Sequence, residues 1–310
     1  MPKKIAKTDT ISHEEWLEQR RKGIGGSDAA TIVGLNPYNS LYALWADKQG
    51  FLPTKDDNEA MRVGRDLEEY VARRFCEATG KKVRRTNYIY AHDDFDFIRA
   101  NVDREIIGEN AGLECKTTSA YAKSDFDGGE IPLNYLCQCY HYMNVMGYDK
   151  MYLAVLVMGK GFYWYEIPAD KAEQKALLNA EIDFWRQYIE GNEIPAPDGS
   201  ESSAMAVAAV NPEDSKEIIS LIPYETDLKN YAELLQSIKE LEREAEAIKQ
   251  TVQAFMGTAG LGESRRYKVS WKAQQRTTVD SRKLKADFPD IYKQVTKTTE
   301  SRVFRFAERN

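Results

Sequence analysis

Two carboxylates and a lysine lie close together in one stretch of this 310-residue chain. Asp103 is followed, after ten intervening residues, by Glu114, and Lys116 comes two positions later. We expect residues 112–118 to be a strand and Asp103 to lie on its neighbour, so Glu114 and Lys116 share one face and the side chain of Cys115 lies on the other. Without a cation between them, Asp103 and Glu114 would repel each other and one would keep its proton. Carboxylate oxygens are the ligands that Mg²⁺ prefers, so the spacing predicts a divalent-metal site.

A third acidic ligand is expected from the helix predicted over residues 58–79. Arg65, Glu69 and Arg73 lie four residues apart and predict an ion-pair stripe in solvent. Glu68 lies on another face, which is otherwise small or apolar and includes Gly64, Ala72 and Phe75. A glycine one turn before a lone inward acid leaves room for a metal or a substrate. We therefore predict that Glu68, rather than Glu69, completes the site.

A glycine-rich turn near the N-terminus is a second candidate site. Residues 25–27 stand at the predicted start of a short helix, and Arg21 precedes them. Backbone N–H groups at a helix start favour anions, so the turn predicts a phosphate site that includes Arg21 and Ser27. Asp28 opposes an anion by its charge, and a tight turn with a helix cap is the alternative interpretation.

Charge is unevenly distributed along the chain. The net charge is −6, yet residues 265–310 hold 13 Lys or Arg against 5 Asp or Glu, a balance of +8 that leaves −14 for the rest. Local rather than total charge engages phosphates, so this basic tail is a candidate DNA contact, with a solvated tail as the alternative. The tail residues expected to contact DNA are Lys268, Lys272, Arg276, Arg302 and Arg305.

The composition predicts a globular protein of the cytoplasm, with 42% hydrophobic and 30% charged residues. No apolar run approaches the roughly 20 residues that a membrane helix needs. The basic N-terminal residues are not followed by the apolar stretch of a secretory signal. Four cysteines without a CxxC pair favour free thiols over a disulfide framework or an iron–sulfur cluster.

The hydrophobic pattern predicts the elements that must position these residues. Alternation with β-branched and aromatic residues predicts a strand meander over 83–91, 96–107 and 112–118, and a buried hairpin over 151–157 and 162–167. Helices are predicted over 12–21, 27–33, 40–50, 58–79, 132–146 and 170–191. Together they predict an α/β core over residues 1–191, with a mixed central sheet flanked by helices.

Beyond this core, the sequence predicts a linker over residues 192–226 and a C-terminal part over 227–310. Apolar residues recur at spacings of three and four from Leu228 to Phe255, which predicts an amphipathic helix long enough for a coiled-coil arm. Strands are predicted over 266–273 and 301–306, with a short helix between them. The C-terminal part is thus expected to be a long helix plus a small basic α+β appendage.

The order of these motifs resembles that of the PD-(D/E)XK nuclease superfamily. The matching elements are Gly64-x-x-x-Glu68, Asn101-Val102-Asp103, Leu113-Glu114-Cys115-Lys116 and Tyr135-Leu136-Cys137-Gln138. Asn101-Val102 stands where the superfamily usually has a proline before the aspartate. Within the superfamily, residues 20–188 resemble the YqaJ-type viral recombinases, relatives of phage lambda exonuclease. The further matching segments are residues 21–30, Pro37-Tyr38, Leu44-Trp45 and Tyr140-x-Tyr142-Met143.

The resemblance implies a role for each motif residue. The implied catalytic residues are Glu68, Asp103, Glu114, Lys116 and Gln138. The implied ligands of one or two Mg²⁺ ions, with Mn²⁺ as an alternative, are Glu68, Asp103, Glu114 and the main-chain carbonyl of Cys115. Lys116 would orient the attacking water or offset charge on the phosphate. Arg21 and Ser27 would grip a 5′-terminal phosphate, and Tyr140 is a candidate substrate-binding residue by stacking.

Simpler interpretations of three residues stay open. Lys116 could form an ordinary same-face ion pair with Glu114, and Gln138 could be an ordinary helix residue. Tyr140 could be a core or surface aromatic.

The function implied by the resemblance is an ATP-independent exonuclease that degrades double-stranded DNA 5′→3′ and leaves 3′ single-stranded tails for recombination by strand annealing. The sequence holds no Walker-type phosphate loop, which fits ATP independence. The implied partners are DNA, a phage single-strand annealing protein and further copies of the chain in a trimeric ring, without a membrane. A phage or prophage origin would place the protein in the cytoplasm of a bacterial host.

Two other functions are alternatives. One is a phage PD-(D/E)XK endonuclease or nickase, which needs the same metal site. The other is a non-catalytic DNA-recombination scaffold that acts through the long helix and the basic tail.

Overall fold

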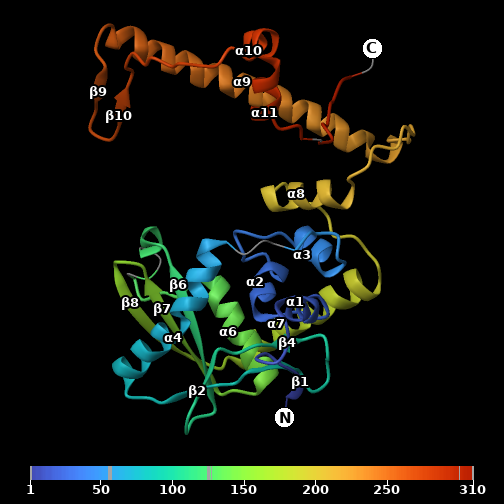
Figure 1. Cartoon of the computed structure of the whole chain (residues 1–310), viewed down its shortest axis with the longest axis vertical. Helices are drawn as coiled ribbons and strands as arrows, with labels where there is room; N and C mark the ends of the chain where they lie inside the picture. Colours follow the sequence, from blue (N-terminus) through green and yellow to red (C-terminus); the bar gives the residue numbers. More distant parts are fainter. Residues whose placement is uncertain (1, 55–57, 124–125, 127, 300, 309–310) are drawn as a thin grey trace. The chain divides into compact units, whose positions relative to one another are not determined.

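The computed structural model describes residues 2–54, 58–123, 126, 128–299 and 301–308. The chain divides into two compact units, Met1–Pro212 and Glu213–Asn310 (Figure 1). Across the described ranges, no helix combines the length and the apolar character that crossing a membrane requires.

A five-stranded mixed sheet forms the centre of the first unit. Its strands, in spatial order, are β2 (Val83–Arg85), β5 (Arg104–Ile106), β6 (Ala111–Thr118), β7 (Lys150–Val157) and β8 (Gly161–Pro168). β6 and β7 run parallel, and the other neighbours are antiparallel. The predicted hairpin is confirmed, since β7 and β8 pair along their whole length. The α/β fold with a mixed central sheet is therefore also confirmed.

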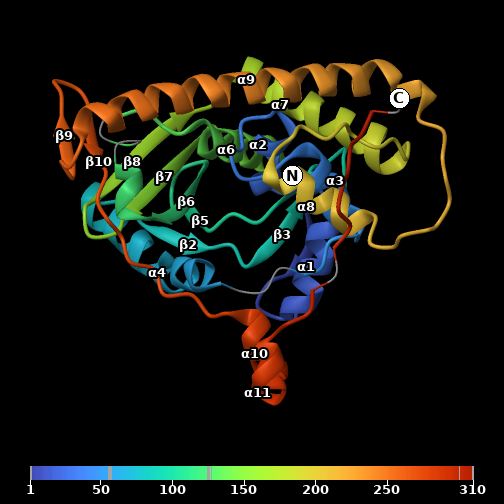
Figure 2. The same ribbon diagram turned by 90° about the horizontal axis from the view of Figure 1, so that it is seen from above.

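Helices cover both faces of this sheet (Figures 1 and 2). Even-numbered residues of β7, such as Tyr152, pack with α4 (Glu59–Thr79). Odd-numbered residues, such as Leu153, belong to the core on the side of α6 (Leu133–Met146). A strand that is buried on both faces must be apolar throughout, which explains the continuous apolar run in the sequence.

Local signals set the ends of the helices that approach the site. Ser12 and Glu15 form the predicted capping box at the start of α1 (His13–Arg21). The side chain of Asn58 accepts a backbone N–H from the first turn of α4. Gly80 ends α4 with a φ of 71°, in the left-handed region that favours glycine.

The predicted strand meander is divided between two sheets, which corrects the expected continuous strands over residues 83–91 and 96–107. Asn87 has a φ of 52°, and this positive φ separates β2 from β3 (Tyr88–Ala91). β3 pairs instead with β1 (Lys3–Lys7) and β4 (Arg99–Ala100) in a small antiparallel sheet. The sequence pattern showed where the chain is extended but not which strands pair.

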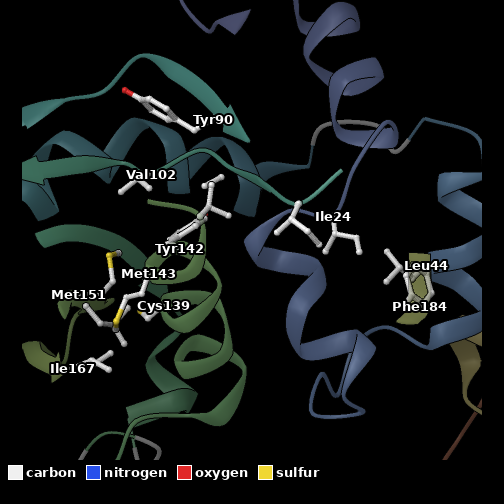
Figure 3. Close-up of a cluster of buried hydrophobic side chains, with 14 of the residues drawn as sticks. Ile24, Leu44, Tyr90, Val102, Cys139, Tyr142, Met143, Met151, Ile167 and Phe184 are labelled. Atoms are coloured by element: carbon white, nitrogen blue, oxygen red, sulfur yellow. The ribbon is translucent and has the colours of Figure 1, made fainter. Parts of the chain in front are cut away.

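A large buried cluster joins the helices of the first unit to the sheet. Among the described residues of this unit, the further helices are α2 (Gly26–Ile32), α3 (Leu41–Lys48), η1 (Ala120–Lys123), α7 (Lys171–Phe184) with its π-helical continuation η2 (Trp185–Glu190), and α8 (Glu201–Val210). Figure 3 shows Ile24, Leu44 and Tyr142 among the buried side chains of the cluster. The glycine-rich turn, α3 and α6 are therefore fixed to one core.

The linker expected over residues 192–226 contains α8, which packs against α3. Ser203 and Ala206 of α8 are each only 1% exposed. The first unit therefore extends to Pro212, beyond the predicted end at residue 191.

The second unit is built on the long helix α9 (Glu225–Met256), which spans 32 residues as the apolar spacing predicts. The other elements of this unit are η3 (Ile222–Tyr224), β9 (Leu261–Glu263), β10 (Lys268–Ser270), α10 (Ser281–Asp287) and α11 (Pro289–Val295). The predicted strand over 301–306 is wrong, because these residues form no strand. The rings of Phe304 and Phe306 lie 6.1 and 5.2 Å from that of Tyr231 on α9.

Candidate active site

β5 and β6 separate after a short stretch of pairing, and the separation opens an edge in the central sheet. β5 pairs only with Gly112 and Leu113 of β6. Two residues further along, the N–H of Cys115 donates to Oδ2 of Asp103 at 2.8 Å. The N–H and C=O of one strand residue point to the same side, so the Cys115 carbonyl also faces the side where Asp103 lies. The edge thus gathers two of the predicted metal ligands.

Glu114 points toward α6 and is only 3% exposed. Its Oε1 accepts a hydrogen bond from Nε2 of Gln138 at 2.6 Å and pairs with Nζ of Lys116 at 2.7 Å. Nε2 of Gln138 also lies 2.8 Å from the hydroxyl of Tyr142. The structure therefore brings Glu114, Lys116 and Gln138 together, as strand alternation and motif order predict.

Glu68 contributes a carboxylate from α4, and this carboxylate is bound to an arginine. Nη1 of Arg104 forms an ion pair with Oε1 of Glu68. Nη2 of Arg104 donates to Oε2 of Glu69 at 2.9 Å, and Arg85 contacts the same oxygen at 3.0 Å. Glu69, which the sequence assigned to a surface stripe along α4, thus contacts arginines from β2 and β5.

Burial raises the pKa of Asp103 well above its usual value, and the charges of Glu114 and Glu68 raise it further. Burial alone would lower the pKa of Lys116, but the charges of Glu114 and Asp103 outweigh it, so its pKa is raised and it stays cationic. Burial also raises the pKa of the Cys115 thiol. That thiol stays neutral near pH 7, which leaves the carbonyl as the ligand this residue offers.

The residues present fit a hard divalent cation. Oε2 of Glu114 is buried and has no hydrogen-bond partner in the described part of the chain. A cation with oxygen ligands would satisfy this atom and would offset both the burial and the carboxylate repulsion that raise the pKa of Asp103. Within the described ranges, no three His, Cys, Asp or Glu side chains form a ready-made ion site. Glu68, the third predicted carboxylate, is the one held by Arg104.

A cleft of about 200 Å³ connects this site with the glycine-rich turn. Asp103 and Gln138 line it from the sheet and α6. Its other wall includes Trp16, Gln19, Arg20, Gly25, Gly26, Ser27 and Arg99. Asp103 and Gln138 from one predicted site and Ser27 from the other therefore line the same cleft.

Arg20, rather than Arg21, lies beside Ser27 in this cleft. Nη2 of Arg20 donates to Oγ of Ser27 at 3.0 Å. The guanidinium of Arg21 donates to the carbonyl of Leu52 at 3.1 Å and lies 3.8 Å from Asp47. Adjacent helix residues point roughly 100° apart, so the docking of α1 decides which arginine faces the cleft. The structure thus places Arg20 in the lining of the cleft and Arg21 outside it.

Asp28 is buried behind the glycine-rich turn and binds its backbone. Its Oδ2 accepts the N–H of Gly25 at 3.0 Å and pairs with Nζ of Lys48 at 2.6 Å. Lys48 also donates to the carbonyl of Arg20 at 2.9 Å. Burial would raise the pKa of Asp28, but Lys48 and Arg20 outweigh it and lower the pKa. The negative charge that opposed an anion site is therefore neutralised locally.

Tyr142, rather than Tyr140, reaches the cleft. Tyr142 lines it beside Gln138. Tyr140 is half-buried and packs against the cluster formed by Ala29, Ala30, Cys137 and Leu177. Residues two positions apart on a helix point roughly 200° apart, so the two tyrosines cannot share this face. The structure therefore places Tyr140 outside the lining of the cleft and against a hydrophobic cluster, as its core interpretation expects.

A buried ion pair beside the cleft was not predicted from the sequence. The side chains of His141 and Glu181 are fully buried, with Nδ1 and Oε1 2.7 Å apart. Nε2 of His141 lies 2.8 Å from the carbonyl of Arg99, a residue that lines the cleft. Burial lowers the pKa of His141, but Glu181 and the Arg99 carbonyl outweigh it and raise the pKa. A single His and a single Glu on different helices carry no pairing signal in the sequence.

The five predicted tail contacts lie in the second unit. Nζ of Lys268 pairs with Glu263 at 2.9 Å across the β9–β10 hairpin. All five side chains are exposed: Lys268, Lys272, Arg276, Arg302 and Arg305.

The first unit has a mixed sheet with helices on both faces, and its acidic residues lie where β5 and β6 separate. This arrangement is a PD-(D/E)XK fold. An alkaline exonuclease from Laribacter hongkongensis shares this fold, with a TM-score of 0.50, 18% identity, and coverage of 57% of this chain and 93% of that chain. The chain matches the YqaJ-like viral recombinase domain over residues 15–149. It is 40% identical to the uncharacterized protein YqaJ of Bacillus subtilis (strain 168), over 98% of this chain and 97% of the relative. The chain therefore belongs to the YqaJ-like viral recombinase family.

Proposed function

We propose that the protein is a Mg²⁺-dependent, ATP-independent exonuclease that degrades double-stranded DNA 5′→3′ and leaves 3′ single-stranded tails for recombination by strand annealing. The observation that carries the proposal is the pair Asp103 and Glu114 beside Lys116, with one oxygen of Glu114 left without a partner in the described residues. The viral recombinase family and the fold shared with an alkaline exonuclease support DNA hydrolysis as the activity.

Each side chain has a distinct part in this proposal. Asp103, Glu114, Glu68 and the Cys115 carbonyl would hold Mg²⁺, or Mn²⁺ in its place. The bound ion supplies Lewis-acid activation of water and phosphate. Lys116, which stays cationic because of the carboxylates around it, orients the water and offsets charge that develops on the phosphate. Gln138 fixes the orientation of the Glu114 carboxylate through its 2.6 Å hydrogen bond.

The other end of the cleft suits a 5′-terminal phosphate. Arg20 and Ser27 present a guanidinium and a hydroxyl 3.0 Å apart, and Lys48 neutralises the nearby Asp28. A guanidinium binds phosphate oxygens through its paired donors. Arg20 therefore takes the role first assigned to Arg21.

The test compares four DNA substrates with Mg²⁺ and with a chelator. These are linear duplex with 5′-phosphate ends, linear duplex with 5′-hydroxyl ends, nicked circles and closed circles. We expect the phosphorylated linear duplex to be degraded fastest, and the closed circle to survive. Glu114→Gln should lower turnover by more than about 10²-fold, because it removes a ligand charge at the reacting phosphate. Arg20→Gln should remove the preference for 5′-phosphate, whereas the matched control Arg21→Gln should keep it.

Other outcomes select the alternatives. Cutting of the closed circle would favour the endonuclease or nickase. DNA binding without hydrolysis, unchanged in Glu114→Gln, would favour the non-catalytic scaffold.

We also propose that the basic tail contacts DNA outside the cutting site, supported by the exposure of its Lys and Arg side chains and its local balance of +8. Charge reversal at Lys268 and Lys272 should reduce the salt dependence of DNA affinity by about one unit per lost phosphate contact. An unchanged salt slope would contradict the tail contact. The trimeric ring and the annealing-protein partner stay predictions from the family resemblance.

A further inference from the structure

Arg104 is a buried cation at the start of β5 that contacts α4 and the backbone of the candidate metal site. Its side chain is 3% exposed. Nη1 pairs with Glu68 and also donates to the main-chain carbonyl of Asp103 at 2.7 Å. Nη2 donates to Glu69 at 2.9 Å. One guanidinium therefore holds two adjacent carboxylates of α4 and the backbone of a third acidic residue.

The two carboxylates are unequal partners of Arg104. The side chain of Glu68 is 30% exposed, and its charge is felt at Asp103 in the site. The side chain of Glu69 is 69% exposed and is also held by Arg85 at 3.0 Å. If Glu68 turned away, Arg104 would still keep Glu69 and the Asp103 carbonyl. Its buried charge would not be left unpaired, which is the costly case for a buried ion.

We propose that Arg104 is a positioning residue that exchanges its contact with Glu68 for a divalent cation when one binds, while Glu69 keeps Arg104 in place. The inference rests on the proposed function, because it takes Glu68 as a metal ligand.

This exchange makes Arg104 a competitor of the metal. A guanidinium is always protonated and offers paired donors in a fixed fork, so it can hold Glu68 and Glu69 together at any ordinary pH. The cation must displace it from Glu68, and the metal affinity is lowered by the free energy of that contact. In return, α4 stays docked on β5 and Glu68 stays near Asp103 while the site holds no ion.

The test measures Mg²⁺ binding to the full chain by isothermal titration calorimetry, without DNA or turnover. Arg104→Gln keeps side-chain donors but removes the charge, and we expect it to bind Mg²⁺ about tenfold more tightly than the wild type. In a Glu68→Gln background, the same substitution should leave the affinity unchanged. Arg85→Gln is the matched control, since it removes an arginine that contacts Glu69 but not Glu68.

Three results separate failure of the exchange from failure of the metal site. A wild-type chain that shows neither a heat of Mg²⁺ binding nor a Mg²⁺-dependent rise in melting temperature would overturn the proposed metal function itself. A wild-type chain that binds Mg²⁺, with Arg104→Gln equal or weaker, would overturn the exchange alone. Equal tightening with and without Glu68 would show a general charge effect and also overturn it. If Arg104→Gln does not fold, Arg104→Lys replaces it, because an ammonium lacks the fork and should give a smaller tightening in the same direction.

Discussion

His141 and Glu181 are fully buried and lie next to the wall of the cleft rather than in its lining. Through Nε2, His141 holds the carbonyl of Arg99, whose guanidinium in turn donates to Gln19 at the cleft. Oε2 of Glu181 has no hydrogen-bond partner within the described residues, so the contact of Oε1 with His141 is the main compensation for burying this carboxylate. At the scale of single residues, the pair of His141 and Glu181 thus holds Arg99 in the wall of the cleft without lining the cleft itself.

We predict that His141→Ala destabilises the protein by about 3–5 kcal/mol at pH 6, because Glu181 is left buried without its partner. The pKa of His141 is raised in the folded state by Glu181 and the Arg99 carbonyl, against burial. The stabilisation is therefore fully present below the unfolded pKa of about 6.5 and is lost as the pH rises through the folded pKa. Urea unfolding should show a smaller difference between wild type and variant at pH 9 than at pH 6. A difference that grows with pH would contradict this assignment.

At the scale of elements, the close approach of α2 to α6 shapes the cleft. A Cβ on Gly26 would lie 2.7 Å from the ring of Tyr142 and 2.9 Å from Cγ of Gln138. A Cβ on Gly25 would meet only Asp28, at 3.8 Å. Packing therefore requires a glycine at position 26 but leaves space for a side chain at position 25.

We predict that Gly26→Ala costs about 1–3 kcal/mol of stability through overpacking and lowers DNA hydrolysis by displacing Gln138 from Glu114. Gly25→Ala should cost less than about 1 kcal/mol, the effect of a poorer helix cap. Thermal unfolding and initial rates on linear duplex measure both effects. Equal behaviour of the two variants would show that the approach of α2 to α6 is not tight.

At the scale of the whole molecule, the first unit includes α8 and ends at Pro212. Ala206 is 1% exposed and belongs to the main core, so α8 is an integral part of that unit. The chain beyond Pro212 forms the second unit, which holds α9 and the predicted tail contacts. A deletion after residue 212 therefore tests the role of the second unit, and a deletion after residue 191 also tests the role of α8.

We predict that a chain ending at residue 212 unfolds cooperatively and still hydrolyses DNA weakly, because it keeps the core and the cleft. A chain ending at residue 191 loses α8 and uncovers α3. Each kcal/mol lost should lower its melting temperature by about 2–4 °C at this size. Calorimetry of the two truncations checks this, and equal melting temperatures would show that α8 adds nothing to the first unit.

The amino-acid sequence by itself determined the features that depend on local periodicity and capping. Strand alternation put Glu114 and Lys116 on one face, and helix periodicity chose Glu68 over Glu69 for the side toward the sheet. The α/β order and the long helix α9 followed in the same way. These features are predictable because the 2.0 and 3.6 residue periods are properties of the backbone.

Tertiary structure decided everything that depends on how one element docks on another. It selected Arg20 over Arg21 and Tyr142 over Tyr140 for the cleft, and it brought Arg104 to Glu68. It also paired His141 with Glu181 from separate helices. The side chains of neighbouring residues on a helix point in different directions. Which of them makes a contact depends on the element that packs against that side of the helix. The sequence thus predicted the residue types of the site, and the packing of α1, α4 and α6 determined which of their side chains are in contact.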